Sequence, residues 1–120
     1  MARHVLLLDL KDDAALIAAY ERWHAAGAVP AAVVAGIRGA AVTAMEIYRA
    51  GPRLVMVMET APAFDPDAKA VADAADPEIA AWELLMDQFQ QPIPSAAPGS
   101  KWTQAARIFS LAEQPALRIG

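Results

Sequence analysis

Hydrophobic residues recur along this chain with two different periods, which divide it into short strand-like and helix-like segments. Residues 3–10 are rich in valine and leucine and are bounded by charged residues, which predicts a buried strand. Over residues 13–24 the apolar positions recur every three or four residues, so this segment is predicted to be an amphipathic helix. Asp12 or Asp13 is expected to cap its first turn, and Gly27 is expected to end it.

The middle of the chain predicts a short helix followed by a hairpin. A helical pattern runs over residues 30–38; Pro30 suits its first turn, and Gly39 follows its end. Residues 42–49 and 53–60 are strand-like, and the connecting Ala-Gly-Pro of residues 50–52 is typical of a hairpin turn. Residues 54–58, LVMVM, are apolar at every position, as expected of a strand that is covered on both faces.

Two Asp-Pro pairs, at 65–66 and 76–77, predict helix starts in which aspartate is the N-cap and proline takes the first helical position. The second of these helices is expected to run from Pro77 to about Gln90. Its apolar side carries Ile79, Trp82, Leu85, Met86 and Phe89. The prolines of residues 91–100 exclude both a helix and a central strand, and residues 105–111 are predicted to form the last strand.

The predicted order is therefore strand, helix, strand, strand, helix, strand. This βαββαβ order is typical of the α+β class with a ferredoxin-like, split βαβ fold, in which helices cover one face of an antiparallel sheet. We expect a single domain over residues 1–120, with a core of 1–112 and a C-terminal tail of 113–120. The other sheet face would be bare, so a second copy is expected to cover it and form a homodimeric α/β barrel.

Composition and charge restrict the class of partner. The chain is 57% hydrophobic, has a formal net charge of −4 and contains no cysteine, which excludes a disulfide framework and a thiolate nucleophile. Because no basic run is present, we expect neither nucleic acid nor a membrane surface as partner. The first apolar run is interrupted by Asp9 and is too short to span a membrane, and it lacks a signal cleavage site. A cytoplasmic location is expected.

The candidate chemistry lies in aromatic and histidine side chains. Tyr20 and His24 are four residues apart, so they lie one above the other on the apolar side of the first predicted helix. A phenol and an imidazole in an apolar interior need hydrogen-bond partners or a ligand. Trp82 is expected to face the same sheet, and an indole beside polar groups is typical of a sugar site. The alternatives are a structural or capping His24 and a Trp82 that only fills the core.

Other kinds of site have less support in the sequence. His4 and His24 are the only histidines, so no multi-histidine metal site is expected, and the glycines do not form a phosphate-binding loop. Glu46 is flanked by large apolar residues; it is a candidate for substrate binding, or it pairs with Arg53 across the hairpin. Of the site types considered, the sequence leaves acid–base chemistry by a single histidine, without metal or cofactor.

Several short motifs together resemble the L-rhamnose mutarotase family, from about His4 to Leu111. They are the Tyr20-x-x-x-His24 helix, the Ile47-Tyr48 strand, Trp82 before Leu85-Met86-Asp87, and the proline-rich run that leads to RIFSL. The resemblance implies a dimeric ferredoxin-like barrel that interconverts the α and β anomers of L-rhamnose without a cofactor. It also implies that His24 is the general acid and that Tyr20 and Trp82 contact a monosaccharide.

The departures from the family pattern concern the sugar. Ala81 stands where the family has a second tryptophan, Met45 where it has a tyrosine, and Ala31 where it has a glutamate after the proline. The stretches MEIYR, RLVMVMET and FQQPIP resemble the branch associated with L-fucose. The sequence thus predicts a mutarotase for a 6-deoxyhexose, L-rhamnose or L-fucose. The alternatives are a cofactor-free α+β barrel monooxygenase and a non-enzymatic small-ligand binding module.

Overall fold

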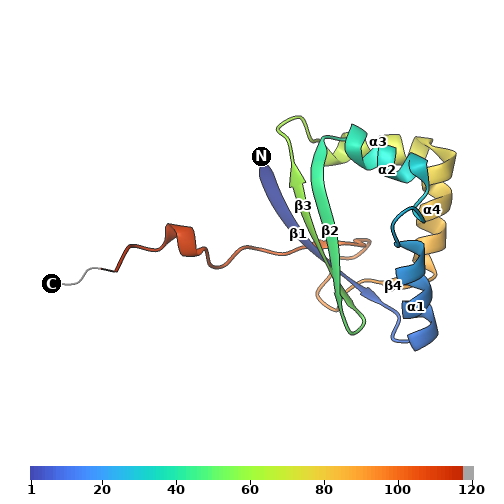
Figure 1. Ribbon diagram of the computed structural model, residues 1–120, viewed down its shortest axis with the longest axis horizontal. Coiled ribbons are helices and arrows are strands. Elements are labelled where there is room, and N and C mark those ends of the chain that lie inside the picture. The colour runs from blue at the N-terminus through green and yellow to red at the C-terminus, as the bar shows by residue number, and fades with distance from the viewer. Residues whose placement is uncertain (118–120) are drawn as a thin grey trace.

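Helices cover only one face of an antiparallel sheet in the computed structural model, which describes residues 1–117 (Figure 1). The strands are β1 (Ala2–Leu10), β2 (Val42–Ala50), β3 (Arg53–Thr60), β4 (Gln90–Gln91) and β5 (Thr103–Gln104). The helices are α1 (Ala14–Trp23), α2 (Ala31–Gly39), α3 (Pro66–Ala75), α4 (Pro77–Asp87) and the short 3₁₀ helix η1 (Leu111–Glu113). This architecture confirms the predicted α+β, ferredoxin-like class.

The sheet has the order β2-β3-β1-β4, and β5 also pairs with β1. The register places Leu6 opposite Met56, which in turn lies opposite Ile47. Because side chains alternate along a strand, these three residues share the face toward the helices. The adjacent residues along each strand, such as Val5 and Val57, face the opposite way, toward the outer face, which no helix covers (Figure 1).

Aspartate caps fix the starts of three helices. The carboxylate of Asp13 accepts a hydrogen bond from the backbone N–H of Leu16 at 3.0 Å, and Asp65 and Asp76 cap α3 and α4 in the same way. The predicted N-caps are therefore confirmed. Helix α1 ends at Trp23, earlier than predicted; His24 is its C-cap, and Gly27, with φ +82°, lies in the turn beyond.

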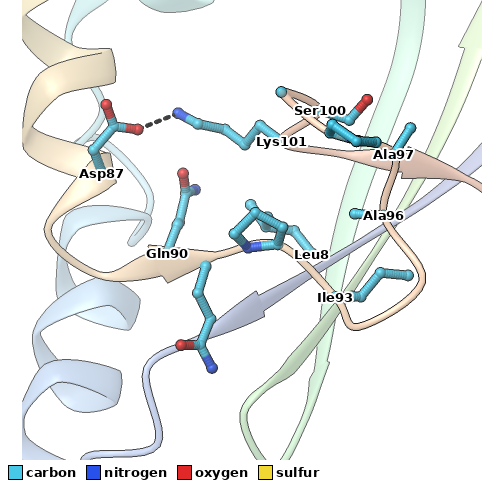
Figure 2. Close-up of a pocket in the computed structure, with 12 residues that line it drawn as sticks. Leu8, Asp87, Gln90, Ile93, Ala96, Ala97, Ser100 and Lys101 are labelled. Carbon is cyan, nitrogen blue, oxygen red and sulfur yellow. Dashed lines mark ion pairs between the residues drawn. The ribbon is translucent and has the colours of Figure 1, made fainter.

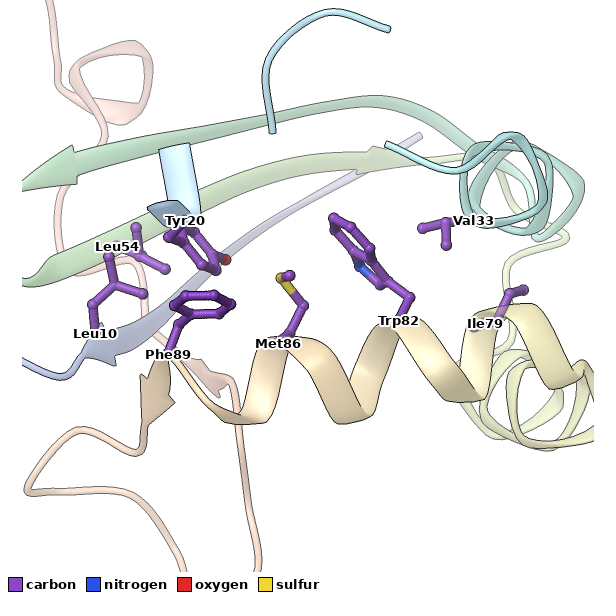
Figure 3. Close-up of a cluster of buried hydrophobic side chains, with 8 residues drawn as sticks. All are labelled: Leu10, Tyr20, Val33, Leu54, Ile79, Trp82, Met86 and Phe89. Atoms are coloured by element: carbon purple, nitrogen blue, oxygen red, sulfur yellow. The ribbon is translucent and has the colours of Figure 1, made fainter. Parts of the chain in front are cut away.

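Helix α4 anchors the core. Ile79, Trp82 and Met86 project from α4 toward the sheet, and Phe89 does so just after the helix ends (Figure 3). The full buried cluster is Leu10, Tyr20, Val33, Leu54, Ile79, Trp82, Met86 and Phe89. The apolar side predicted for this helix is thus confirmed, except that Leu85 is only partly buried.

The predicted last strand over residues 105–111 is wrong. In this part of the chain, the two residues of β5 pair with β1, and one further hydrogen bond runs from Ala105 N to Val5 O at 2.7 Å. The chain then leaves the body as an arm on the side away from the helices (Figure 1). Ile108 and Phe109 are 96% and 65% exposed, because this segment meets no facing surface of its own chain. Residues 118–120 of the predicted tail lie outside the described residues.

Within one chain, the expected covering of residues 54–58 on both faces is found on one face only. Leu54 and Met58 face the helices and are buried, but Val55 and Val57 on the outer face are only partly covered. The described residues include no helix that is long and apolar enough to cross a membrane.

We predict that Asp13→Ala lowers the free energy of unfolding by about 1 kcal/mol, because it removes the N-cap of α1. Asp12→Ala is the matched control, since the Asp12 side chain is exposed and α1 is capped by Asp13. Its change should stay within about 0.5 kcal/mol. Urea unfolding followed by circular dichroism measures both values, and equal losses in the two variants would contradict the assigned cap.

Candidate functional site

A cavity of about 380 Å³ lies between the helices and the inner face of the sheet. Small-molecule sites in proteins typically measure about 300–1,000 Å³. Its polar and aromatic lining consists of Tyr20, His24, Phe64, Lys69, Asp73, Trp82, Glu83, Gln90 and Trp102. The sheet side is made of Leu6, Met45, Ile47, Met56 and Met58, so thioethers form much of this wall.

Three of the four predicted site residues meet at this cavity. The ring centroid of His24 lies 4.2 Å from that of Tyr20 and 5.4 Å from that of Trp82. Tyr20 and Trp82 are 3% and 8% exposed, whereas His24 is partly exposed. Tyr20 and His24 come from the end of α1 and Trp82 from the middle of α4, so the packing of these two helices assembles the group.

A backbone hydrogen bond fixes the tautomer of His24. Its Nδ1 lies 2.8 Å from the carbonyl oxygen of Tyr20, one helical turn earlier. Because a carbonyl oxygen only accepts, Nδ1 carries the hydrogen and donates it. The other ring nitrogen, Nε2, is then the one that accepts a proton when the ring is neutral and donates it when the ring is charged.

The phenol of Tyr20 is kept protonated. Burial raises its pKa, although the hydrogen bond from Gln90 and the charge of Lys101 partly oppose this. The side-chain amide of Gln90 donates to the phenol oxygen at 3.1 Å. Because the oxygen accepts from Gln90, the hydroxyl hydrogen of Tyr20 is free to be donated to a ligand in the cavity.

Glu46 does not join this group, which corrects its prediction as a substrate-binding residue. Met45 and Ile47 line the cavity, so strand alternation directs Glu46 to the outer face, where it is exposed. There its carboxylate lies on the same side of the strand as Tyr48 and raises the pKa of that phenol. Arg53 is not its partner either, because Nε of Arg53 donates to Asp9 at 2.8 Å.

Sequence reasoning missed Gln90 and Trp102 as cavity residues. Gln90 lies in β4, and Trp102 comes just before β5 at the end of the proline-rich segment. No motif marked Gln90, whereas an aromatic residue beside a proline-rich loop is a signal that could have pointed to Trp102. Both reach the cavity because β4 and β5 pair with the central strand β1.

Lys101 fixes the loop that carries Trp102. Its Nζ lies 2.6 Å from Asp87 (Figure 2) and 3.0 Å from Glu83, both on α4. Partial burial lowers the pKa of Lys101, but its hydrogen bonds to the two carboxylates outweigh this effect and raise it. A second hollow, of about 480 Å³, lies under this loop; it shares Gln90 with the first but contains neither histidine nor tyrosine.

Comparison with known proteins decides the family, because residues 3–111 match the L-rhamnose mutarotase family. The chain belongs to this family. It is 51% identical over 120 residues to an L-fucose mutarotase of Xanthomonas campestris pv. campestris, covering 100% of this chain and 96% of that protein.

The fold is also similar to a crystal structure of an L-rhamnose mutarotase from Formosa agariphila, with a TM-score of 0.66. The two chains are 14% identical, and the match covers 92% of this chain and 99% of the other. At this identity the likeness concerns the fold alone.

Family membership confirms the resemblance that the sequence motifs indicated. The protein is a sugar mutarotase, an isomerase that acts on carbohydrates. This decides against the monooxygenase and the non-enzymatic binding module as its main function. The roles of His24, Tyr20 and Trp82 in this mutarotase stay predictions, which the geometry of the cavity now makes specific.

The raised pKa of Tyr20 predicts a pH dependence of stability. Ionisation of the phenol is less favourable in the folded than in the unfolded chain, whose pKa is near 10.0. Its contribution to stability is therefore complete below about pH 10 and is lost as the pH rises through the folded-state pKa. Tyr20→Phe should lose less stability between pH 9 and pH 11 than the unchanged protein.

Urea unfolding at both pH values measures this difference. Tyr48→Phe is the comparison variant: Glu46 raises the pKa of Tyr48 at an exposed position, where water screens the interaction, so this variant should change the pH dependence of stability less than Tyr20→Phe does. If Tyr20→Phe and the unchanged protein lost stability equally, Tyr20 would not be the desolvated phenol described above.

Proposed function

We propose that this mutarotase interconverts the α and β anomers of L-fucose, with L-rhamnose as the alternative 6-deoxyhexose, and that His24 is its acid–base group. The observation that carries this proposal is the hydrogen bond from Nδ1 of His24 to the Tyr20 carbonyl, which leaves Nε2 free in a residue lining the cavity. The 51% identity to an L-fucose mutarotase supports L-fucose as the first sugar to test.

The chemistry requires one proton to change places. As the bond between the anomeric carbon and the ring oxygen breaks, the anomeric hydroxyl loses its proton and the ring oxygen gains one. Neutral Nε2 of His24 accepts the first proton, and the imidazolium returns a proton to the ring oxygen. The resulting aldehyde rotates and closes on its other face, by the reverse transfers. One histidine thus accepts and returns every proton that the reaction moves, and these steps involve no metal or cofactor.

The neighbouring side chains hold the sugar. The hydroxyl of Tyr20 donates to a sugar oxygen, because Gln90 already satisfies its acceptor side. The indole of Trp82 offers an apolar surface to the C–H groups of the ring. Their burial around His24 excludes water from one side of the reacting group.

We predict that His24→Ala lowers the rate of enzymatic anomer exchange by about 10²- to 10⁴-fold, the usual contribution of a positioned acid–base group. Saturation-transfer NMR on L-fucose and L-rhamnose measures the exchange directly. His4→Ala is the matched control: His4 bonds to Thr60 and does not line the cavity, so its loss should leave the rate unchanged.

The variant must keep its circular dichroism spectrum for this test to count. Full activity in folded His24→Ala would contradict the proposed role. If the unaltered protein did not accelerate anomer exchange of either sugar above its rate in buffer, the proposed substrates would be contradicted.

We further propose that two copies pair through the outer face of the sheet. Val5, Leu7, Val55 and Val57 form an apolar centre on this face, and the pairs Arg3–Glu59 and Asp9–Arg53 flank it. The arm leaves on the same side of the sheet and carries Ile108 and Phe109 into the open (Figure 1). A second copy is the partner that matches both features, because a two-fold axis brings the same apolar face and arm from each chain together.

The cytoplasmic location stays a prediction.

We predict that Val57→Lys converts the dimer to a monomer, because it places a charge at the centre of this face. Val71→Lys is the control, since Val71 is an exposed valine on α3, away from the sheet. Light scattering coupled to size exclusion measures the mass. A monomeric unaltered protein, or a dimeric Val57→Lys variant, would contradict the proposed interface.

A further inference from the structure

Gln90 is held in a fixed position beside the catalytic cavity. Its backbone pairs with Leu10 in the β1–β4 ladder, so the two side chains share the face toward the helices. Leu10 belongs to the buried core together with Tyr20. Figure 2 shows the Gln90 side chain projecting from β4 on the side of Asp87 and Lys101. The amide is therefore directed by the sheet and not by a mobile loop.

The two ends of this amide have different surroundings. Nε2 donates to the phenol oxygen of Tyr20 at 3.1 Å. Oε1 is buried, and no group in residues 1–117 donates a hydrogen bond to it. A buried carbonyl oxygen without a partner costs free energy, so most such atoms in proteins are satisfied. The phenol of Tyr20 accounts for Nε2, whereas Oε1 has no partner within the described fold.

The position of the unpaired oxygen relates it to the sugar. Oε1 and Nε2 are bonded to the same carbon, so the free acceptor lies next to the Tyr20 hydroxyl, whose own hydrogen is free. The ring of His24 is 4.2 Å from the ring of Tyr20. An acceptor and a donor side by side, both beside the acid–base group, match a sugar with neighbouring hydroxyls.

We infer that Oε1 of Gln90 accepts a hydrogen bond from a non-anomeric hydroxyl of the sugar, while Nε2 orients the phenol of Tyr20. Gln90 is then a specificity-determining residue of the mutarotase, and this inference rests on the proposed function. A site that binds a hydroxyl through a buried polar group discriminates strongly against a substrate that lacks this hydroxyl. One particular hydroxyl should thus be required.

The test compares L-fucose with its 2-, 3- and 4-deoxy analogues, or the same series of L-rhamnose if that is the sugar turned over. With the unaltered protein, one analogue should lose about 10- to 100-fold in kcat/KM for anomer exchange, the range expected for one hydrogen bond to a buried group. Gln90→Met, which keeps the length of the side chain, should lose a similar factor with the parent sugar, mainly in KM. It should no longer discriminate against the sensitive analogue.

Gln88→Met is the control, because Gln88 is exposed on the same segment and does not line the cavity. Its profile over the four sugars should match that of the unaltered protein. Gln90→Asn, whose shorter amide reaches neither partner, replaces the methionine variant if that variant does not fold.

Three outcomes overturn the inference. The first is an unaltered protein that treats all three deoxy analogues like the parent sugar. The second is a Gln90→Met variant with an unchanged profile, and the third is one that loses rate with every sugar by the same factor, as a purely structural change would. Failure of the proposed function is distinct, because the unaltered protein would then accelerate exchange of neither parent sugar.

Discussion

The chemistry proposed for this mutarotase depends on one hydrogen bond at the end of a helix. Nδ1 of His24 donates to the carbonyl of Tyr20, an oxygen that the last turn of α1 leaves without a helical partner. The same backbone thus terminates the helix and sets the tautomer of the imidazole. Tyr20 is in turn held by burial and by Gln90, so the imidazole of His24, the phenol of Tyr20 and the amide of Gln90 form one connected unit.

This unit is supported by elements that are distant in sequence. Helix α4 supplies Trp82, β4 supplies Gln90 and the segment before β5 supplies Trp102. The ion pairs of Lys101 with Glu83 and Asp87 hold the last of these segments against α4. Family membership gives the reaction class, and the proposed contact of the Gln90 amide is where this cavity would distinguish one sugar from another.

Much of the fold could be predicted from the sequence, because local signals govern it. The Asp-Pro pairs mark two helix starts, and the Ala-Gly-Pro of residues 50–52 marks the hairpin. Strand alternation, which places Met45 and Ile47 on the cavity side, could have excluded Glu46 from the site. The strand expected at 105–111 failed because pairing depends on a partner surface, which a local pattern of apolar residues does not specify. Gln90 was missed since its role comes from tertiary contact with Tyr20 across seventy residues.

The thioether wall of the cavity has a consequence for how the reaction is accommodated. Met45, Met56 and Met58 lie on strands whose backbones are held rigidly by their ladders. Unbranched side chains with several rotatable bonds can adapt their shape at little cost. A sugar that opens, turns its aldehyde and closes again changes its outline during every cycle. Adjustment of these three side chains can follow that outline while the sheet stays still.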